Sequence, residues 1–440
     1  MDGTSISGFL SRACKGLLLA GLIIHLFVKD VTPAFTAITS DFPTYITSAK
    51  MVRDGQDAAK FYDAPAFREQ MRLYGIRIPR ENENIAFAPY PPPTALLLLP
   101  LASFQPLTAL RVLVALDVLL LVCSTLLLSR IFRWRRVDAA LFILLSGHAL
   151  HTGMAYGHPY ILVSTVCLLG YYCYLRRMPW LAGFCLGIFV PIKYWPMTIL
   201  AGFGLHRQWR VLLGGGVGAL AVVLLSIAVL GWEVHYLYLT DVAFTHLSGR
   251  LISSALAAHS PQPQSFDMMF AQLFIFDPLQ NPHPLLALEP HVQALALAST
   301  KVILVLAAVP AMVKLVRGTA ASALAPTIGI LAILPLLLAP GSGTYAYALL
   351  WLPVALLVDH FRSEGARLHG YLIFCIYALI GFIPYGHTNL FVGRGGLTVL
   401  AYPRLFLLLT MYFVCIHAVL RPARQGDALR QSPTPAAPSP

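Results

Sequence analysis

Two charged side chains in this sequence stand where they could do chemistry. Asp41 follows the first long apolar run and opens the stretch Asp41-Phe42-Pro43-Thr44-Tyr45. A carboxylate at such a boundary can act as a general base on a hydroxyl group. It can also cap a helix that begins near Pro43, because aspartate is favoured at the N-cap and proline in the first helical turn. The residue types fit both roles, and the sequence leaves them open.

Lys193 is the second candidate, because it lies inside an apolar stretch that covers residues 180–205. A lysine at membrane depth costs about 2.5–3.5 kcal/mol on insertion scales, so it needs a cavity or a partner. A phosphate group is the partner that its charge favours. The alternative is that the long side chain extends to the membrane interface. We expect the lysine to bind an anion.

Three histidines are spaced so that His148 and His151 share a helix face and His158 follows a turn. Three such residues could bind a metal ion, but no carboxylate joins them nearby in the sequence. We therefore predict no metal site and treat His158 as a candidate substrate contact. Asp117 lies inside a long apolar run. We expect it to form a polar contact that links two helices (a polar tie) rather than to act as a catalyst.

A second polar segment carries side chains suited to sugar recognition, namely His259, Gln264 and Ser265. A polar linker would have a similar composition, so these residues are candidates by their chemistry alone. Tyr345 and Tyr347 open a later apolar run and could line the same cavity. The alternative for the tyrosines is an aromatic belt at the membrane interface.

The composition defines the class of protein that must position these groups. Hydrophobic residues make up 58% of the 440 positions and charged residues only 11%, against about 25% charged residues in soluble proteins. The net charge of +12 comes largely from basic clusters beside apolar runs, as the positive-inside rule requires, and not from a soluble basic face that would bind nucleic acid. The seven cysteines lie in or beside apolar runs, so no disulfide framework is predicted. No nucleotide-binding or zinc-protease motif occurs, and no cofactor is predicted.

We predict an all-α polytopic membrane protein with about ten transmembrane helices and one re-entrant helical hairpin. The hairpin covers residues 180–205, because prolines interrupt this stretch and basic residues flank both of its ends. Residues 32–90 and 232–298 form two large external loops, and both termini are cytoplasmic. The membrane domain covers residues 1–425, and the proline-rich residues 426–440 form a disordered cytoplasmic tail. The expected spans are 17–28, 107–132, 137–155, 160–175, 211–230, 300–316, 322–339, 345–359, 370–385 and 403–420.

Several motifs occur in an order that is similar to a known family. They are Asp41-Phe42-Pro43-Thr44-Tyr45; Tyr90-Pro91-Pro92-Pro93, followed by an apolar helix and Pro100-Leu101; Gly183 to Gly187, followed by Lys193-Tyr194-Trp195-Pro196; and Pro263-Gln264-Ser265. With them the chain resembles the polytopic C-type glycosyltransferases. Within that group it resembles the bacterial polyprenyl-phosphate-mannose-dependent α-mannosyltransferases. The similarity extends from about residue 16 to about residue 420.

The resemblance implies a C-type glycosyltransferase fold in a bacterial inner (plasma) membrane, with the active site on the extracytoplasmic side. It implies an inverting transfer of a hexose, expected to be mannose, from a polyprenyl-phosphate donor to a glycolipid or glycan acceptor. Asp41 would be the general base, and Lys193 would neutralise the leaving phosphate. The substrate-binding candidates are Tyr45, His158, His259, Gln264, Ser265 and Tyr347.

The chain departs from the family pattern at three places, where it has Gly157-His158, Ala346-Tyr347 and Pro263 before Gln264. These departures leave the sugar and the acceptor open. A multi-span transporter or lipid flippase is the alternative function, but such a protein would favour internal repeats and short loops. The two large polar segments favour the transferase.

Overall fold

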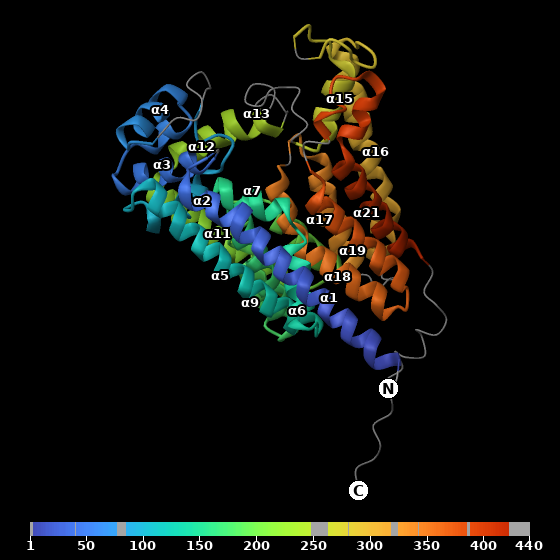
Figure 1. Cartoon of the computed structure of the whole chain (residues 1–440). Helices are drawn as coiled ribbons and strands as arrows, with labels where there is room; N and C mark the ends of the chain where they lie inside the picture. The colour runs from blue at the N-terminus through green and yellow to red at the C-terminus, as the bar shows by residue number, and fades with distance from the viewer. Residues whose placement is uncertain are drawn as a thin grey trace.

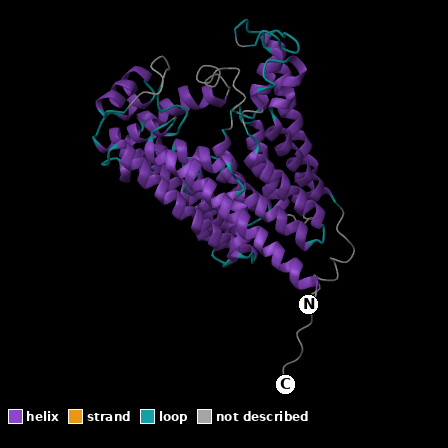
Figure 2. Cartoon of the chain, viewed as in Figure 1, coloured by secondary structure: helices purple, strands orange, loops and turns teal. Residues whose placement is uncertain are grey.

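The computed structural model describes residues 3–39, 41–76, 85–247, 263–279, 281–317, 324–341, 343–384 and 388–421. Over these residues the chain is helical, and its only strand-like pairing is an isolated bridge between Asp277 and Asn281 (Figure 2). The prediction of an all-α fold is confirmed.

The long helices fall into two groups that lie side by side (Figure 1). The first group comes from the N-terminal half, where α9 packs against both α8 and α11, and α5 packs against α8. The second group comes from the C-terminal half, where α17 packs against α18 and α21. The first group is α1 (Gly3–His25), α5 (Pro106–Phe132), α8 (Tyr160–Leu175), α9 (Pro179–Gly187), α10 (Pro196–Leu205) and α11 (Trp209–Leu230). The second is α16 (Pro290–Val316), α17 (Leu324–Leu338), α18 (Trp351–Ser363), α19 (Arg367–Phe382) and α21 (Pro403–Leu420).

The predicted polytopic membrane protein is confirmed, but the helices differ in length from the expected spans. Six helices of the described part are long and apolar enough to cross a membrane, or seven if one bent pair counts as a span. That pair is α6 (Arg136–Leu144) and α7 (His148–Tyr156), which meet at 69° inside the expected span 137–155. The apolar helices α8, α17 and α19 are shorter than the length of about 20 residues that crosses the hydrocarbon core. The count of about ten spans therefore exceeds what helix length alone supports.

The first span is also longer than the sequence suggests. The apolar helix continues from Ala13 to Thr36, through a π-helical segment (Leu26–Val31) and into α2 (Thr32–Thr36). The first polar segment thus starts after Thr36 instead of at residue 32. The second polar segment ends earlier than expected, because α16 begins at Pro290.

The predicted break in the stretch 180–205 is present, since α9 ends at Gly187 and α10 begins at Pro196. Glycines allow helix α9 of this hairpin to pack closely against α11. A Cβ atom on Gly183 would lie 1.9 Å from the Val211 carbonyl oxygen, and one on Gly187 would lie 2.0 Å from that of Gly215. This spacing of small residues allows two helix backbones to approach each other closely within a membrane.

Helices from the two polar segments gather at the end of the molecule opposite the start of α1 (Figure 1). They are α3 (Phe42–Arg53), α4 (Ala64–Leu73), α12 (Glu233–Leu237), α13 (Phe244–Leu247) and α15 (Phe266–Phe274). Every residue of α3 from Phe42 to Met51 is buried. Helix α3 is therefore part of the core and not a solvated surface helix, and it can hold a side chain in a fixed place.

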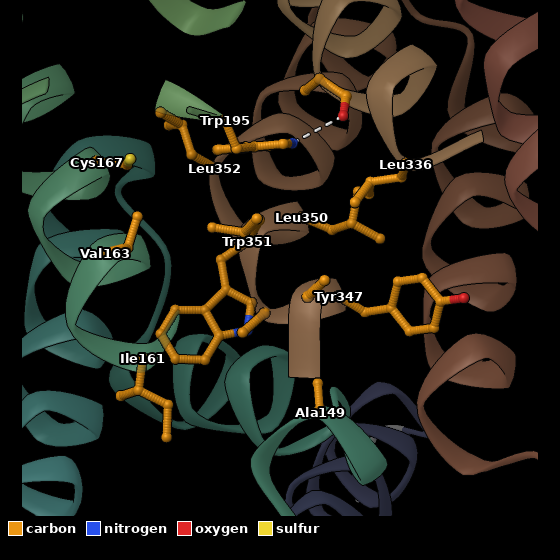
Figure 3. Close-up of a cluster of buried hydrophobic side chains, with 14 of the residues drawn as sticks. Ala149, Ile161, Val163, Cys167, Trp195, Leu336, Tyr347, Leu350, Trp351 and Leu352 are labelled. Carbon is orange, nitrogen blue, oxygen red and sulfur yellow. Dashed lines mark hydrogen bonds between the residues drawn. The ribbon is translucent and has the colours of Figure 1, made fainter. Parts of the chain in front are cut away.

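A buried cluster joins the two groups of helices (Figure 3). Ile161 and Val163 of α8 face Trp351 of α18, which is fully buried. The Trp195 indole donates a hydrogen bond of 2.9 Å to the Ala332 carbonyl of α17, drawn as the dashed line in Figure 3. This bond ties the turn that carries Lys193 to the second group.

Candidate active site

Asp41 stands at the start of α3, where its backbone caps the helix and its side chain does not. Its carbonyl accepts hydrogen bonds from the amides of Thr44 (3.0 Å) and Tyr45 (3.3 Å). The carboxylate makes no cap hydrogen bond. Its Oδ2 atom lies 2.9 Å from Nε2 of His158 instead, and the side chain is 37% exposed. The sequence left open whether the side chain caps the helix or acts as a base. It does not cap the helix, and it is accessible enough to meet a substrate.

His158 reaches Asp41 because α7 ends in a left-handed turn at Gly157, whose φ is +66°. A Cβ atom at Gly157 would lie 2.4 Å from the ring of Phe42, so only glycine lets the turn approach α3 this closely. The His158 side chain is fully buried. Its Nδ1 atom lies 2.9 Å from the hydroxyl of Tyr45. Two sequence candidates, Tyr45 and His158, therefore contact each other and Asp41 in one network.

The electrostatics of the network favour an ionised Asp41 beside a neutral His158. Burial raises the pKa of the Asp41 carboxyl, but the hydrogen bond and charge of His158 and the charge of Lys193 outweigh it, so the pKa falls below the usual 3.8. Burial lowers the pKa of His158, against the opposing effect of Asp41. Burial raises the pKa of Tyr45 well above 10.0, so its hydroxyl keeps its proton.

Lys193 belongs to the same site and lies in the turn between α9 and α10. Its ammonium group is 4.9 Å from the ring centroid of Tyr90 and 4.9 Å from that of Tyr160, which is within cation–π range. Its positive charge is one of the causes that lower the pKa of the Asp41 carboxyl. The two charges that the sequence singled out therefore act on each other.

Tyrosines enclose these charged groups, and the sequence reasoning did not assign Tyr90 or Tyr160 to the site. The Tyr45 and Tyr90 rings lie 4.5 Å apart, and Tyr160 stacks on Tyr345 at 5.0 Å. The Tyr345 ring is 3.7 Å from the imidazole of His158. A signal was available in the sequence, since Tyr90 opens the motif Tyr90-Pro91-Pro92-Pro93 and Tyr160 follows His158 by two positions.

The candidates Gln264 and Ser265 of the second polar segment form hydrogen bonds with backbone groups of other elements. Gln264 is buried, donates to the Ala401 carbonyl (2.9 Å) and accepts from the Arg404 amide (3.2 Å). Ser265 caps α15 and donates to the Pro340 carbonyl at 2.7 Å. These bonds give both side chains a structural role between α15 and the second helix group. His259 is outside the described residues.

Tyr347 also lies away from the network. Its side chain is 2% exposed and packs in the core cluster of Figure 3. Its neighbour Tyr345 is the residue of this segment that contacts His158. Of the two tyrosines, Tyr345 therefore contacts the network and Tyr347 packs in the core.

The remaining polar candidates do not converge on the network. Nδ1 of His151 lies 2.9 Å from Oδ1 of Asp30, so this histidine has its own carboxylate. No three metal-binding side chains of the described residues come together to hold a metal ion. Asp117 is buried and its Oδ2 has no hydrogen-bond partner in the described part of the chain, so the expected polar tie is not seen at this atom. The tie between α5 and α8 is made by Ser124 and Thr165 at 2.8 Å.

The site thus combines an accessible ionised carboxylate with a cation in an aromatic enclosure, on a polytopic helical membrane protein. A carboxylate of this kind can remove a proton from a hydroxyl, and a cation beside it can stabilise a departing anion. Aromatic side chains also provide flat apolar surfaces with polar ends. This set of groups suits the transfer of a group between two oxygen atoms.

Comparison with known proteins agrees with this class. Residues 87–340 of the 440 match the model of glycosyltransferase family 87, and the chain belongs to this family. The match includes Tyr90, His158 and Lys193, while Asp41 and Tyr45 precede it.

A relative from Mycobacterium tuberculosis is named polyprenol-phosphate-mannose-dependent alpha-(1-2)-phosphatidylinositol mannoside mannosyltransferase. It is 28% identical to the chain over 190 residues, which cover 39% of this chain and 43% of the relative. The aligned part is therefore less than half of that protein.

Proposed function

We propose that the protein transfers a hexose, expected to be mannose, from a polyprenyl-phosphate donor to a glycolipid or glycan hydroxyl, with inversion at the anomeric carbon. The observation that carries this proposal is one tyrosine-lined site in which Asp41 contacts His158 at 2.9 Å and the Lys193 ammonium lies 4.9 Å from the rings of Tyr90 and Tyr160. The family membership supports the reaction class, and the printed name of the relative supports the donor.

In the proposed reaction Asp41 accepts the proton of the acceptor hydroxyl. The acceptor oxygen forms a bond to the anomeric carbon while the bond from that carbon to the phosphate oxygen breaks, and the bonding electron pair leaves with the phosphate. The positive charge of Lys193 stabilises the phosphate as its charge increases. Attack from the side opposite the leaving group gives inversion. The proton, the sugar and the phosphate are all accounted for without a further reactant.

A lipid-linked donor also fits the position of the site. Asp41 opens α3, which is one of the helices that gather at the end opposite the start of α1 (Figure 1). The basic residues of the sequence concentrate at the other ends of the apolar helices, as in the turns after α5 and α8. The positive-inside rule assigns that side to the cytoplasm. We infer an extracytoplasmic active site in a bacterial inner membrane with cytoplasmic termini.

The test is transfer of radiolabelled mannose from polyprenyl-phosphate-mannose by the purified protein in detergent, with membrane lipid extracts as acceptors. Asp41→Asn is the test variant. Asp54→Asn is the matched control, because Asp54 ends the same helix and pairs with Arg53. All variants are checked for folding by size exclusion. Transfer by the wild type and the control, with loss in Asp41→Asn, supports the proposal. Equal transfer by all three would remove Asp41 from the mechanism, and absence of transfer with any polyprenyl-phosphate sugar would overturn the reaction.

A further inference from the structure

We propose that His158 is a positioning residue that holds the Asp41 carboxylate in the orientation in which it accepts the proton of the acceptor. Nε2–H of His158 donates to Oδ2 of Asp41, and the hydroxyl of Tyr45 keeps the histidine proton on Nε2. This inference rests on the proposed function and concerns how its base is prepared.

The first step is the order of the hydrogen bonds. Nδ1 of His158 lies 2.9 Å from the Tyr45 hydroxyl, and Nε2 lies 2.9 Å from Oδ2 of Asp41. A neutral imidazole has one donor nitrogen and one acceptor nitrogen. Because a carboxylate only accepts hydrogen bonds, Nε2 must be the donor, and Nδ1 accepts from Tyr45. The other tautomer would place two lone pairs against each other.

The second step is burial. The His158 side chain is fully buried, while Asp41 keeps 37% of its side chain exposed. An acceptor hydroxyl can therefore reach Asp41 but not the imidazole, which excludes His158 as the base that contacts the substrate. The proton of the acceptor therefore goes to the Asp41 carboxylate, whose orientation is fixed by Nε2–H of His158 and by a hydrogen bond from Tyr90. His158 keeps its own proton throughout the reaction.

The third step is the rigidity of the imidazole. The Tyr345 ring lies 3.7 Å from the imidazole, and the Tyr45 ring lies at 5.5 Å with its plane nearly perpendicular. Gly157 supplies the turn that brings the ring there. An imidazole held on these sides cannot rotate freely, and a carboxylate bound to it keeps one orientation. Preorganisation of this kind lowers the cost of reaching the transition state.

The test uses three variants of the network, measured as kcat and KM over a range of pH. His158→Leu removes the donor, and we expect kcat to fall on the order of 10-fold or more, as for loss of a hydrogen bond to a charged group, with the KM of the donor unchanged. The acid limb of kcat/KM should also move to higher pH, because the hydrogen bond of His158 no longer lowers the pKa of Asp41, while Lys193 and Tyr90 still act on it. His158→Gln should restore most of kcat, since its amide can donate to Asp41 and accept from Tyr45. Tyr45→Phe should lose part of kcat, because the tautomer is no longer fixed.

A matched control separates positioning from general damage. His235 is also buried and hydrogen-bonded, to Ser226 (2.9 Å) and to the Gly231 carbonyl (2.8 Å), outside the network. His235→Leu should lower thermal stability without moving the acid limb. If His158→Leu keeps the wild-type kcat and pH profile, or if His158→Gln is as impaired as His158→Leu, the positioning role is wrong.

A stability measurement, which does not depend on catalytic activity, tests this inference separately from the proposed function. Thermal unfolding of the wild type, Asp41→Asn, His158→Leu and the double variant forms a double-mutant cycle. We expect a favourable coupling at pH 7 that disappears when the pH falls below the pKa of Asp41. A coupling of zero at pH 7 overturns the inference even if the wild type transfers mannose. A clear coupling in a protein without transferase activity would refute the proposed reaction and leave the contact standing.

Discussion

Nε2 of His158 lies 2.9 Å from Oδ2 of Asp41, although the two residues are 117 positions apart in the chain. This contact joins the start of α3, in the first polar segment, to the turn between α7 and α8. Helix α3 can serve as a platform because its residues from Phe42 to Met51 are buried. The contact therefore connects a side chain of the first polar segment to the apolar helices, and Lys193 belongs to the same site from a third element.

The first prediction concerns pH. Asp41 must be ionised to act as a base, and its pKa lies below 3.8, so kcat/KM should fall only when the pH drops below about that value. Lys193 must carry a proton to stabilise the phosphate, so kcat/KM should also fall at the alkaline pH where Lys193 loses its proton. A pH–rate profile of mannose transfer measures both limbs. Lys193→Arg should extend the alkaline limb, because arginine keeps its charge. An unchanged alkaline limb in this variant would exclude Lys193 as its source.

The second prediction concerns the charge of Lys193 itself. Lys193→Met removes the cation between Tyr90 and Tyr160, and we expect kcat to fall by roughly 10²–10³-fold, as for the loss of one preorganised stabilising group. The measurement is single-turnover transfer at saturating donor. Lys60→Met is the control, since Lys60 lies in the first polar segment outside the described network and should retain full activity. Equal rates in both variants would contradict the assignment.

The third prediction concerns the packing of the hairpin. Gly183→Ala would place a Cβ atom 1.9 Å from the Val211 carbonyl oxygen, so α9 and α11 must separate. We expect a loss of about 1–3 kcal/mol in stability, as for overpacked cores. Gly216→Ala on α11 is the control, because nothing lies within 4 Å of its added Cβ and alanine favours the helix. Thermal unfolding in detergent should show a lower midpoint for the first variant alone.

The fourth prediction concerns Asp117. This residue is 2% exposed, its Oδ2 has no hydrogen-bond partner in the described part, and it lines a cavity of about 150 Å³ with Thr94 and several leucines. A buried polar group without a partner costs free energy. Asp117→Leu should therefore raise the unfolding midpoint, by about 1–3 kcal/mol in stability. Asp117→Asn should gain less, because the amide still lacks partners. A lower midpoint for Asp117→Leu would mean that the carboxyl has a partner in the native membrane.

The sequence by itself determined the class of the protein and indicated the two charges of the proposed site. Long apolar runs have to be helices in a membrane, because their backbone groups must be satisfied internally. The prolines around Lys193 predicted the break between α9 and α10, because proline has no backbone N–H and interrupts the hydrogen bonds of a helix. Asp41 and Lys193 stood out because a charge is costly beside or within apolar runs, and the structure brings both into one site.

Only the tertiary structure shows which other polar residues lie beside Asp41 and Lys193. Gln264 and Ser265 have the same chemistry as sugar-binding residues, yet their hydrogen bonds go to backbone groups of the second helix group. Tyr345 contacts the site and Tyr347 the core, although they are two positions apart. Which of these side chains reaches the site depends on the direction in which it points and on contacts between segments that are distant in the sequence. Local composition cannot predict these contacts, because they form only when the helices pack.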